Sequence, residues 1–430
     1  MTSCKQKRAV RGEFTDYDKM NINVVDCENP IKKLSGQFMK AIFFSSTFYE
    51  SAIQLGDHHL AREFSKNGWK VAFISTPLSP FHVLSGINAT LIDRFNNCLH
   101  FGHTYKYGKG ELFSYVPFTF LPQKEYWLLK NGFVFNHWHQ FIFPPLKFWL
   151  KKNGFENVDI IFLREPKQKN LIAGINYNKL IYRIADLDKA FTHFEKFNEA
   201  AERELIQNAD HVIYTAHALK DYAAGMNPKD MCYLPNGVDL SNFLNKTTVK
   251  PQEYTRITGP KVVYVGSIKY WFDFDLLNYL TKTLPDVNFI IIGPLGKYTK
   301  YFHKRKNLLL LGARKNEDTP NYLHYANIGI IPFNRTQYPD LIDSVNPLKL
   351  YEYTACGLPV VSTFWKELET INPPAILCKS KTDFVDAINY YLNNRPNTKQ
   401  QLAFAKQHDW SIRYTQLMDQ IYKNENCYSE

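Results

Sequence analysis

A lysine and a glutamate three residues apart are the side chains with the clearest potential for chemistry in this chain. Lys349 and Glu352 follow Asn346 and Pro347 and precede Gly357. Asn is a common helix N-cap, Pro suits the first helical position, and Gly supplies a left-handed stop, so the segment predicts a helix of about three turns. The three-residue spacing places both charges on one helical face, close to the N-terminal end.

That end of the predicted helix suits a phosphorylated ligand. A helix N-terminus carries free N–H groups and a positive dipole, and it therefore attracts phosphate. Lys349 would add a cation for the phosphates, and Glu352 would offer two carboxylate oxygens to sugar hydroxyls. A surface ion pair between the two side chains is the alternative interpretation. The residues that frame the helix favour the ligand site.

A candidate general base lies more than 150 residues earlier. Asp186 follows a strand predicted over residues 179–183, and ligands of open parallel sheets gather at the carboxyl ends of the strands. A carboxylate there can accept a proton from a substrate hydroxyl, although an Asp in this position can also cap a helix. Asp188 is the second candidate. His58 and His59 are expected to face the same cleft, with capping or packing as the alternative.

The sequence predicts that the helices and strands that position these residues form two α/β units. Apolar runs alternate with helical periods, first as a strand at 40–46, a helix capped by Asp57 and a strand at 71–74. This strand–helix–strand pattern predicts a doubly wound parallel sheet. The first strand is not followed by G-x-G-x-x-G, which argues against a dinucleotide cofactor in this half. A second series of strands follows the polar segment 241–259, at residues 261–265, 287–292, 308–311 and 328–332.

These patterns divide the chain into five parts. Residues 1–37 are polar and are predicted to be a disordered tail. Residues 38–240 form one Rossmann-like domain, 241–259 a linker and 260–407 a second Rossmann-like domain. Residues 408–430 form a C-terminal helix that is expected to pack back on the first domain.

Composition limits the class of partner and the location. The 430 residues carry 52 Lys and Arg against 41 Asp and Glu, and this net charge of +11 favours an anionic partner: a nucleotide, a phospholipid surface or nucleic acid. The seven cysteines include no C-x-x-C pair, so neither a zinc site nor a disulfide framework is expected, and a reducing cytoplasm is the simplest location. We find neither a secretory signal nor a run of about 20 apolar residues, and we expect a protein that does not cross a membrane.

Residues 121–155 differ in composition from the rest of the chain. They hold ten aromatic residues, five lysines and one glutamate. Tyr, Trp and Lys suit the headgroup layer of a bilayer, which would make the protein peripheral on the cytoplasmic membrane face. The alternative is that the aromatic residues are ordinary core and the lysines ordinary surface.

Several segments together resemble a known family, the GT-B glycosyltransferases. The donor-site signature of the group 1 (family 4) members is similar to residues 331–333, 344–353, 356–357 and 359–361. Residues 234–239, 264–268 and 209–212 agree as well. The segment Tyr-Arg-Ile-Ala-Asp at 182–186 resembles the strand end that holds the base in the xanthan-type glucuronosyltransferase, an inverting GT-B enzyme.

The resemblance implies two facing Rossmann-like domains, of which the first binds an acceptor and the second a nucleotide-sugar. It implies sugar transfer from a donor, with UDP favoured, to a hydroxyl of a glycan or lipid-linked acceptor, with no cofactor or metal. Asp186 would be the catalytic base. The donor contacts would come from these residues: Gly266, Ser267, Ser344, Val345, Asn346, Lys349 and Glu352.

The chain departs from the group 1 pattern at one position. Retaining members carry two glutamates eight positions apart; Glu352 matches the second, whereas Ser344 stands where the first is expected. The donor sugar and the anomeric outcome are therefore open. Two other functions also stay open: a GT-B-type sugar-nucleotide epimerase, and a non-catalytic protein that binds glycan or nucleic acid. Nucleic acid is the less favoured partner, because the chain has neither zinc-finger spacing nor an RNP-like motif.

Overall fold

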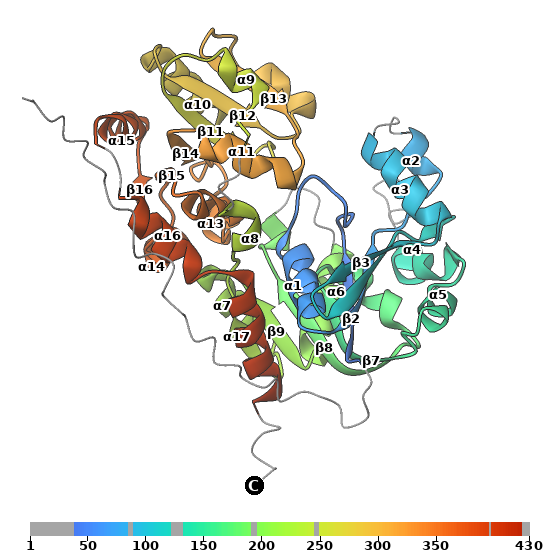
Figure 1. The fold of residues 1–430 in the computed structure, drawn as a ribbon. Coiled ribbons are helices and arrows are strands. Elements are labelled where there is room, and N and C mark those ends of the chain that lie inside the picture. The colour runs from blue at the N-terminus through green and yellow to red at the C-terminus, as the bar shows by residue number, and fades with distance from the viewer. Residues whose placement is uncertain are drawn as a thin grey trace, which may run out of the picture. The chain divides into compact units, whose positions relative to one another are not determined.

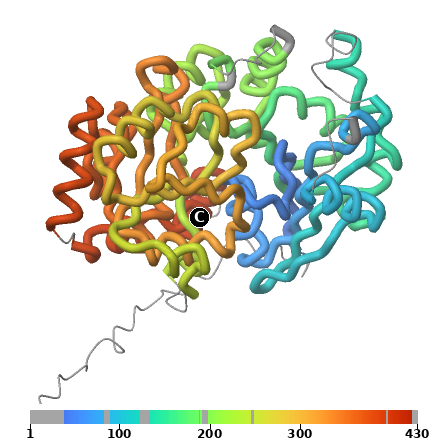
Figure 2. Tube along the Cα trace, turned by 90° about the horizontal axis from the view of Figure 1, so that it is seen from above, coloured from blue at the N-terminus to red at the C-terminus, as the bar shows by residue number. Residues whose placement is uncertain are grey.

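The computed structural model describes residues 38–84, 89–121, 132–190, 196–244, 249–394 and 397–423. The predicted tail 1–37 lies outside the described residues. The described chain is built from parallel sheets and helices, in two lobes (Figure 1). Seen from above, the blue-to-green and the yellow-to-orange parts of the chain occupy separate halves (Figure 2).

The first lobe contains a sheet of order β10-β9-β8-β7-β1-β2-β4-β3. All neighbours pair in parallel except β3, which runs antiparallel to β4. Its strands are β1 (Lys40–Ser45), β2 (Lys70–Ser75), β3 (His103–Tyr107), β4 (Gly110–Tyr115), β7 (Asn157–Leu163), β8 (Asn176–Ile184), β9 (His211–Tyr214) and β10 (Met231–Tyr233). A separate antiparallel pair joins β5 (Phe118–Thr119) to β6 (Ile142–Phe143).

Helices connect these strands, as parallel pairing requires. The α-helices are α1 (Gly56–Lys66), α2 (Phe81–Leu84), α3 (Ala89–Leu99), α4 (Gly132–His137), α5 (Leu146–Lys152), α6 (Lys196–Asn208) and α7 (Lys220–Ala224). Four 3₁₀ turns complete the lobe: η1 (Trp138–Phe141), η2 (Pro166–Ile172), η3 (Asp188–Ala190) and η4 (His217–Leu219).

The second lobe has an all-parallel sheet of order β13-β12-β11-β14-β15-β16. Its strands are β11 (Lys261–Val265), β12 (Asn288–Ile292), β13 (Leu308–Gly312), β14 (Ile328–Ile331), β15 (Val360–Thr363) and β16 (Ala375–Cys378). Its helices are α8 (Leu240–Phe243), α9 (Gln252–Thr255), α10 (Phe274–Thr283), α11 (Thr319–His324), α12 (Pro339–Asp343), α13 (Leu348–Ala355), α14 (Lys366–Ile371), α15 (Lys381–Asn393) and α16 (Thr398–Lys406), with η5 (Gly296–Tyr301) and η6 (Asn316–Asp318).

Each sheet has its own apolar core because the central strands are buried on both faces. In the first lobe, Phe43 of β1 stacks on Phe162 of β7 with 4.4 Å between ring centroids. The segment predicted as a linker, 241–259, contributes Phe243 and Tyr254 to the second core, and both side chains are fully buried. Residues 245–248 of that segment lie outside the described residues.

The last helix, α17 (Trp410–Tyr422), packs on the first lobe. Trp69 Nε1 donates a hydrogen bond to the Tyr414 hydroxyl at 2.9 Å, and the Tyr414 ring meets Phe64 edge-on at 5.1 Å. Trp410 stacks on His59 with centroids 5.3 Å apart. The chain therefore returns to its first helix, α1, after completing the second lobe. No helix of the described chain is both long and apolar enough to span a bilayer.

Two predicted helix starts differ from the structure. Helix α13 begins at Leu348 with Pro347 as its N-cap, so Asn346 is not the cap, and the helix is only eight residues long. Helix α1 begins at Gly56 after Leu55, so Asp57 is not its cap either. In both cases the polar side chain bonds to a distant part of the chain instead of a nearby N–H. Gly357 has φ +67°, which confirms the predicted left-handed stop.

Candidate active site

A cleft of about 820 Å³ lies where the carboxyl ends of both sheets meet. In the first lobe its walls are the residues that follow β1, β7 and β8, and in the second lobe those that follow β11, β12 and β14. Open parallel sheets bind ligands at such strand ends. The lining holds six basic and three acidic side chains: Arg164, Lys167, Arg183, Lys269, Arg314 and Lys349, against Glu165, Asp186 and Glu352.

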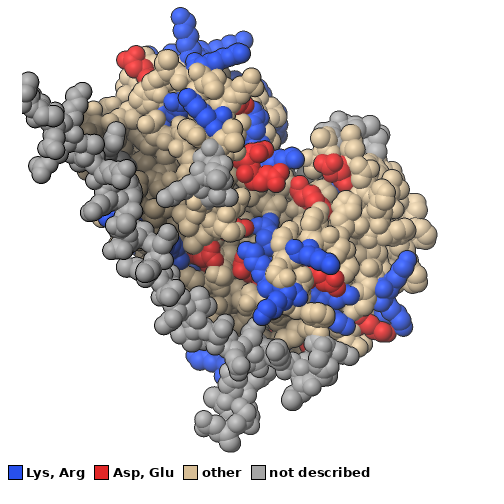
Figure 3. All heavy atoms as spheres, in the orientation of Figure 1, with Lys and Arg blue, Asp and Glu red and all other residues tan. Residues whose placement is uncertain are grey.

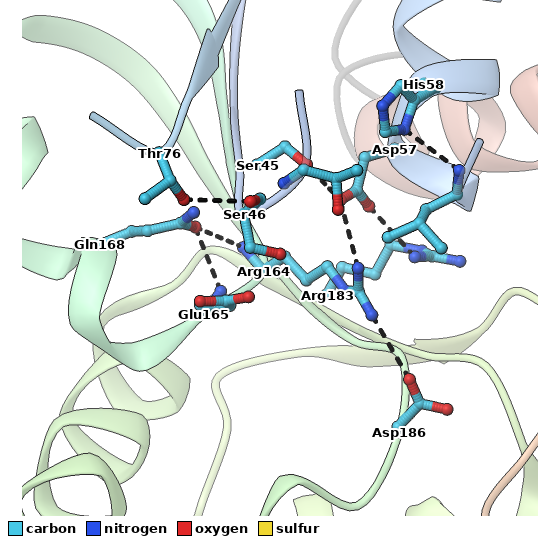
Figure 4. Close-up of polar contacts among 12 residues, drawn as sticks. Ser45, Ser46, Asp57, His58, Thr76, Arg164, Glu165, Gln168, Arg183 and Asp186 are labelled. Atoms are coloured by element: carbon cyan, nitrogen blue, oxygen red, sulfur yellow. Dashed lines mark hydrogen bonds and ion pairs between the residues drawn. The ribbon is translucent and has the colours of Figure 1, made fainter. Parts of the chain in front are cut away.

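Four charged residues form a cluster on the first-lobe wall (Figure 4). The Arg183 guanidinium is buried and donates to Asp57 Oδ1 at 3.2 Å. Arg164 lies between Asp57 and Asp186, with Nη1 3.9 Å from Asp57 Oδ2 and Nη2 3.4 Å from Asp186 Oδ2. Two cations thus face two carboxylates. Gly56 is required beside this cluster, because a Cβ there would lie 2.5 Å from Arg183 Nη2.

Asp186 follows β8 and lines the cleft with 27% of its side chain exposed. Burial raises the pKa of this carboxyl, and the charges of Arg164, Arg183 and Lys349 partly oppose that rise. A carboxylate with a raised pKa is a better proton acceptor, and its exposed part can reach a ligand. The side chain of Asp188, the second candidate, lies outside the described part of the chain.

The two histidines do not face the cleft, which corrects the sequence-based expectation. His58 is fully buried; its Nδ1 accepts from Leu55 N at 3.1 Å and its Nε2 lies 3.1 Å from Phe48 O. Burial lowers its pKa to about 4. His59 is covered by Trp410 of α17. Both residues position α1 by packing, because tertiary contacts cover the helix turn that carries them.

Lys349 enters the cleft from the first turn of α13. Its Nζ lies 5.3 Å from the ring centroid of Tyr264 and 5.2 Å from that of Phe333. Burial lowers its pKa to about 8, although Glu352 and Asp186 favour the charged form. Gly266 makes room for this side chain, since a Cβ at Gly266 would lie 2.3 Å from Lys349 Cε. The absence of a side chain at Gly266 therefore leaves the space that Lys349 occupies.

The other predicted donor contacts divide into two groups. Ser267, Val345 and Glu352 line the cleft beside Lys349. Burial raises the pKa of Glu352 to about 7, and Lys349 partly opposes the rise. Ser344 instead is buried under the cleft wall, where its hydroxyl donates to Leu341 O at 2.8 Å and accepts from Leu187 N at 3.2 Å. This serine connects the second lobe to the residue that follows Asp186.

Asn346 is also buried, and it joins the two lobes. Its Oδ1 accepts from Asn236 N at 3.1 Å, while Asn236 Nδ2 donates to Asn346 O at 2.6 Å. Asn236 Oδ1 in turn accepts from Arg183 Nη2 at 2.7 Å. The chain of bonds continues on the other side, where Asn346 Nδ2 donates to Glu367 Oε1 at 3.0 Å. The amide that was predicted to cap a helix is therefore a contact between lobes.

Glu367 is a residue that the sequence analysis missed. Its carboxylate is 1% exposed and accepts from the backbone N–H of His217 at 2.6 Å and from the Tyr233 hydroxyl at 3.0 Å, both in the first lobe. Its partners come from distant elements, so no local spacing marks it. Arg164 was missed as well, although its place directly after the apolar strand β7 is a signal of the kind that identified Asp186.

Within the described residues, no group of three or more His, Cys, Asp or Glu side chains is arranged to hold a metal ion. The basic side chains of the cleft can neutralise an anion directly, and the N-terminus of α13, with its positive dipole, lies at the same wall. This arrangement can bind a phosphorylated ligand on one wall and accept a proton on the other.

Two family models match the chain, one in each lobe. Residues 43–215 match the N-terminal domain of the glucuronosyltransferase GumK, and residues 275–419 match a glycosyl transferase-like domain. Both matches agree with the resemblance found in the sequence.

Curated relatives and solved structures give the same result. A protein named as the teichuronic acid biosynthesis glycosyltransferase TuaH of Bacillus subtilis is 25% identical over 238 residues, which is 52% of this chain and 59% of that protein. The UDP-glucuronate:glycolipid 2-beta-glucuronosyltransferase of Xanthomonas campestris is 29% identical over 209 residues, 47% of this chain and 46% of that protein. The chain thus spans about half the length of these relatives. The Anabaena protein HepE, solved in complex with UDP and glucose, shares the fold with a TM-score of 0.59 and 16% identity over 90% of this chain and 100% of that one. The predicted GT-B fold is confirmed.

The contacts of Glu367 lead to a stability prediction. Glu367→Ala leaves the buried Asn346 amide, the Tyr233 hydroxyl and the His217 backbone N–H without their acceptor, and we expect it to lower the free energy of unfolding by about 3 kcal/mol. Glu369→Ala is the matched control, because Glu369 lies on the same helix and only pairs with exposed Lys366. Urea unfolding followed by tryptophan fluorescence measures both. Equal stability of the two variants would contradict a structural role for Glu367.

Proposed function

We propose that this chain, which resembles the GT-B glycosyltransferases in sequence in both lobes and in fold throughout, transfers a sugar from a UDP-sugar to a hydroxyl group of a glycan or lipid-linked acceptor, without a bound metal. One observation carries the proposal. Asp186 of the first lobe and Lys349 of the second line the same cleft, close enough for the lysine charge to lower the pKa of the carboxyl.

The second lobe would bind the donor. Lys349 and the positive end of the α13 dipole favour a diphosphate, whose charge grows as the sugar–phosphate bond breaks. Glu352 lies one turn further along α13 and can accept hydrogen bonds from ribose hydroxyls. The supporting relative here is HepE, whose structure contains UDP and glucose.

The first lobe would activate the acceptor. An acceptor hydroxyl attacks the anomeric carbon of the donor sugar, the bond from that carbon to the UDP oxygen breaks, and the hydroxyl proton passes to Asp186. UDP leaves with the electron pair of the broken bond. Attack opposite to the leaving group in one step inverts the anomeric centre. Arg164 and Arg183 would keep Asp186 in place for this transfer.

The acceptor side would lie at a membrane surface. Five aromatic side chains are exposed on neighbouring elements of the first lobe, and we call them the aromatic patch: Phe120, Phe133, Phe141, Phe143 and Phe148. The exposed lysines Lys147, Lys151 and Lys152 accompany it on α5. The outer side of this lobe is largely without charge in Figure 3, with basic side chains beside it. Other aromatic residues of 121–155, such as Trp138 and Trp149, are buried in the core of the first lobe. Residues 122–131 lie outside the described part of the chain.

The function itself is tested by donor binding and turnover. Isothermal calorimetry should show UDP binding, and UDP-sugars should be converted only when an acceptor is present. Conversion of a UDP-sugar to its epimer without acceptor would establish an epimerase instead, and affinity for RNA or glycan without affinity for UDP would establish a non-catalytic binding protein. Turnover that survives EDTA supports the metal-independent reaction.

Asp186→Asn should keep the UDP dissociation constant within about twofold and reduce kcat by about 10²- to 10⁴-fold, because the amide cannot accept the proton. Asp93→Asn, on the exposed surface of α3, is the control and should leave kcat unchanged. Initial rates with a radiolabelled UDP-sugar measure the effect. Near-normal turnover of Asp186→Asn would eliminate Asp186 as the base.

Lys349 should make UDP binding depend on pH. Because its pKa is about 8, the cation is present at pH 7 and is lost as the pH rises to 9. The UDP dissociation constant should therefore rise at least fivefold over this range, and the Lys349→Arg variant should resist the change. Lys349→Ala should weaken binding about tenfold at pH 7, whereas the exposed Lys282→Ala should not. A pH-independent dissociation constant would remove Lys349 from the phosphate site.

The aromatic patch leads to a separate prediction. The double variant Phe143→Ser/Phe148→Ser should bind vesicles of phosphatidylcholine and phosphatidylglycerol at least tenfold more weakly than the unaltered chain, since each phenyl ring contributes about 2 kcal/mol on burial. Tyr390→Ser, an equally exposed aromatic of the second lobe, is the control. Cosedimentation with vesicles gives the affinities. Equal binding of both variants would rule out membrane contact through the patch.

A further inference from the structure

The first lobe contains a second cavity, of about 100 Å³, next to the cleft. Ser45, Ser75 and Thr76, at the carboxyl ends of β1 and β2, form one side, and Trp138 of η1 and Gln168 of η2 line it as well. The cavity is large enough for a group bigger than one water molecule. Nothing in the proposed transfer step uses it.

Two buried donors of this cavity have no acceptor. Ser75 Oγ and Trp138 Nε1 make no hydrogen bond to any residue of the described chain, although the two side chains are only 2% and 4% exposed. Buried polar groups are almost always hydrogen bonded, so each exception requires an explanation. An indole N–H can only donate, and the missing partner of Trp138 must therefore be an acceptor such as a ligand oxygen.

The position of the cavity indicates where such an oxygen comes from. On one side it adjoins the cleft, because Lys167 lines both spaces and Ser45 precedes the cleft residue Ser46. On the other side it adjoins the aromatic patch: Thr119 precedes the exposed Phe120, and Trp138 begins the turn that ends at the exposed Phe141. Figure 4 shows Thr76 and Gln168 on the far side of Arg164 from Asp186.

The charges around the cavity narrow the chemistry of the ligand. Lys167 already pairs with Glu165 at 2.7 Å, so this cation is balanced. Ser45 Oγ lies 3.3 Å from Asp57 Oδ2, and Thr76 Oγ1 donates to Ser46 O at 3.1 Å. Trp138 Nε1 and Ser75 Oγ therefore require acceptor oxygen atoms that belong to a neutral or weakly charged group. A pyranose ring, with hydroxyl oxygens on successive carbons, meets this demand.

We propose that this cavity binds a sugar unit of the acceptor, with hydroxyl oxygens that accept from Trp138 Nε1 and Ser75 Oγ. The inference rests on the proposed function and specifies its acceptor: a sugar bound between the aromatic patch and the cleft belongs to a lipid-linked glycan. The lipid lies at the patch, the sugar unit fills the cavity, and the reacting hydroxyl points toward Asp186.

The indole N–H of Trp138 gives a direct test. In protein labelled with ¹⁵N-tryptophan, the seven tryptophans give indole resonances, and Trp138→Phe identifies that of Trp138. Titration with methyl β-glucopyranoside should shift this resonance. Trp410 is the matched control, because its Nε1 is also buried without a partner but lies outside the cavity. Methyl β-glucuronide in a parallel titration shows whether an acidic sugar binds more tightly.

A pair of serine variants tests the same site by affinity. Ser75→Ala removes a hydroxyl that has no partner in the described chain, so it should leave the unfolding midpoint unchanged or higher while weakening methyl glucoside binding at least fivefold. Ser65→Ala removes another buried, unpaired hydroxyl, on α1, and should change neither the affinity nor the Trp138 resonance. A selective loss in Ser75→Ala supports the sugar site and is not expected from a structural serine.

The outcomes separate this inference from the proposed function. UDP binding in calorimetry with no shift of the Trp138 resonance by either glycoside overturns the sugar site and leaves the transferase proposal standing. Shifts of the Trp138 and Trp410 resonances by equal amounts also overturn it, because they indicate a solvent effect. A specific Trp138 shift in a protein that does not bind UDP would keep the sugar site and overturn the transferase.

Discussion

The hydrogen bonds between Asn236 and Asn346 hold the two lobes together at the base of the cleft. From Asn236 the polar contacts continue through Arg183 to Asp57 and, by way of Arg164, to Asp186. From Asn346 they continue to Glu367, which returns to His217 and Tyr233 of the first lobe. Its central members, Asn236, Asn346, Arg183, Asp57 and Glu367, are buried, and a buried network of this kind is rigid only when its donors and acceptors are matched. The position of Asp186 relative to α13 therefore depends on contacts that are not themselves in the reaction.

Burial has opposite effects on the pKa values of Lys349 and Glu352, both on α13. It lowers the pKa of Lys349 to about 8 and raises that of Glu352 to about 7, so both charged forms are weakened near neutral pH. Burial removes water from the Lys349 ammonium. An anionic ligand in the cleft is therefore favoured, because it supplies the electrostatic interaction that the buried ammonium lacks. Gly266 supports this site sterically, because any side chain at position 266 would displace the Lys349 ammonium.

The first lobe arranges three surfaces in order along its exposed strand ends. The aromatic patch is outermost, the small cavity with Trp138 follows, and the cleft with Asp186 is innermost. Such an order suits a substrate that is apolar at one end and reactive at the other. Aromatic residues of 121–155 accordingly occur both as core and as exposed side chains: buried Trp138 begins the short turn that exposed Phe141 ends.

Local patterns in the sequence were enough to predict the α/β class, most strand positions and the glycine that ends α13, since apolar runs and backbone conformations depend on nearby residues. They also placed Asp186, Lys349 and Glu352 at the ends of elements, where the structure finds them lining one cleft. The roles of Asn346, Asp57 and Ser344 were decided by tertiary structure. Asn346 and Asp57 were expected to cap their own helices, and Ser344 was expected to contact the donor. Each instead bonds to a residue more than 100 positions away. Glu367 and the unpaired donor of Trp138 are likewise visible only in three dimensions, because burial and contacts between distant segments produce no spacing pattern in the sequence.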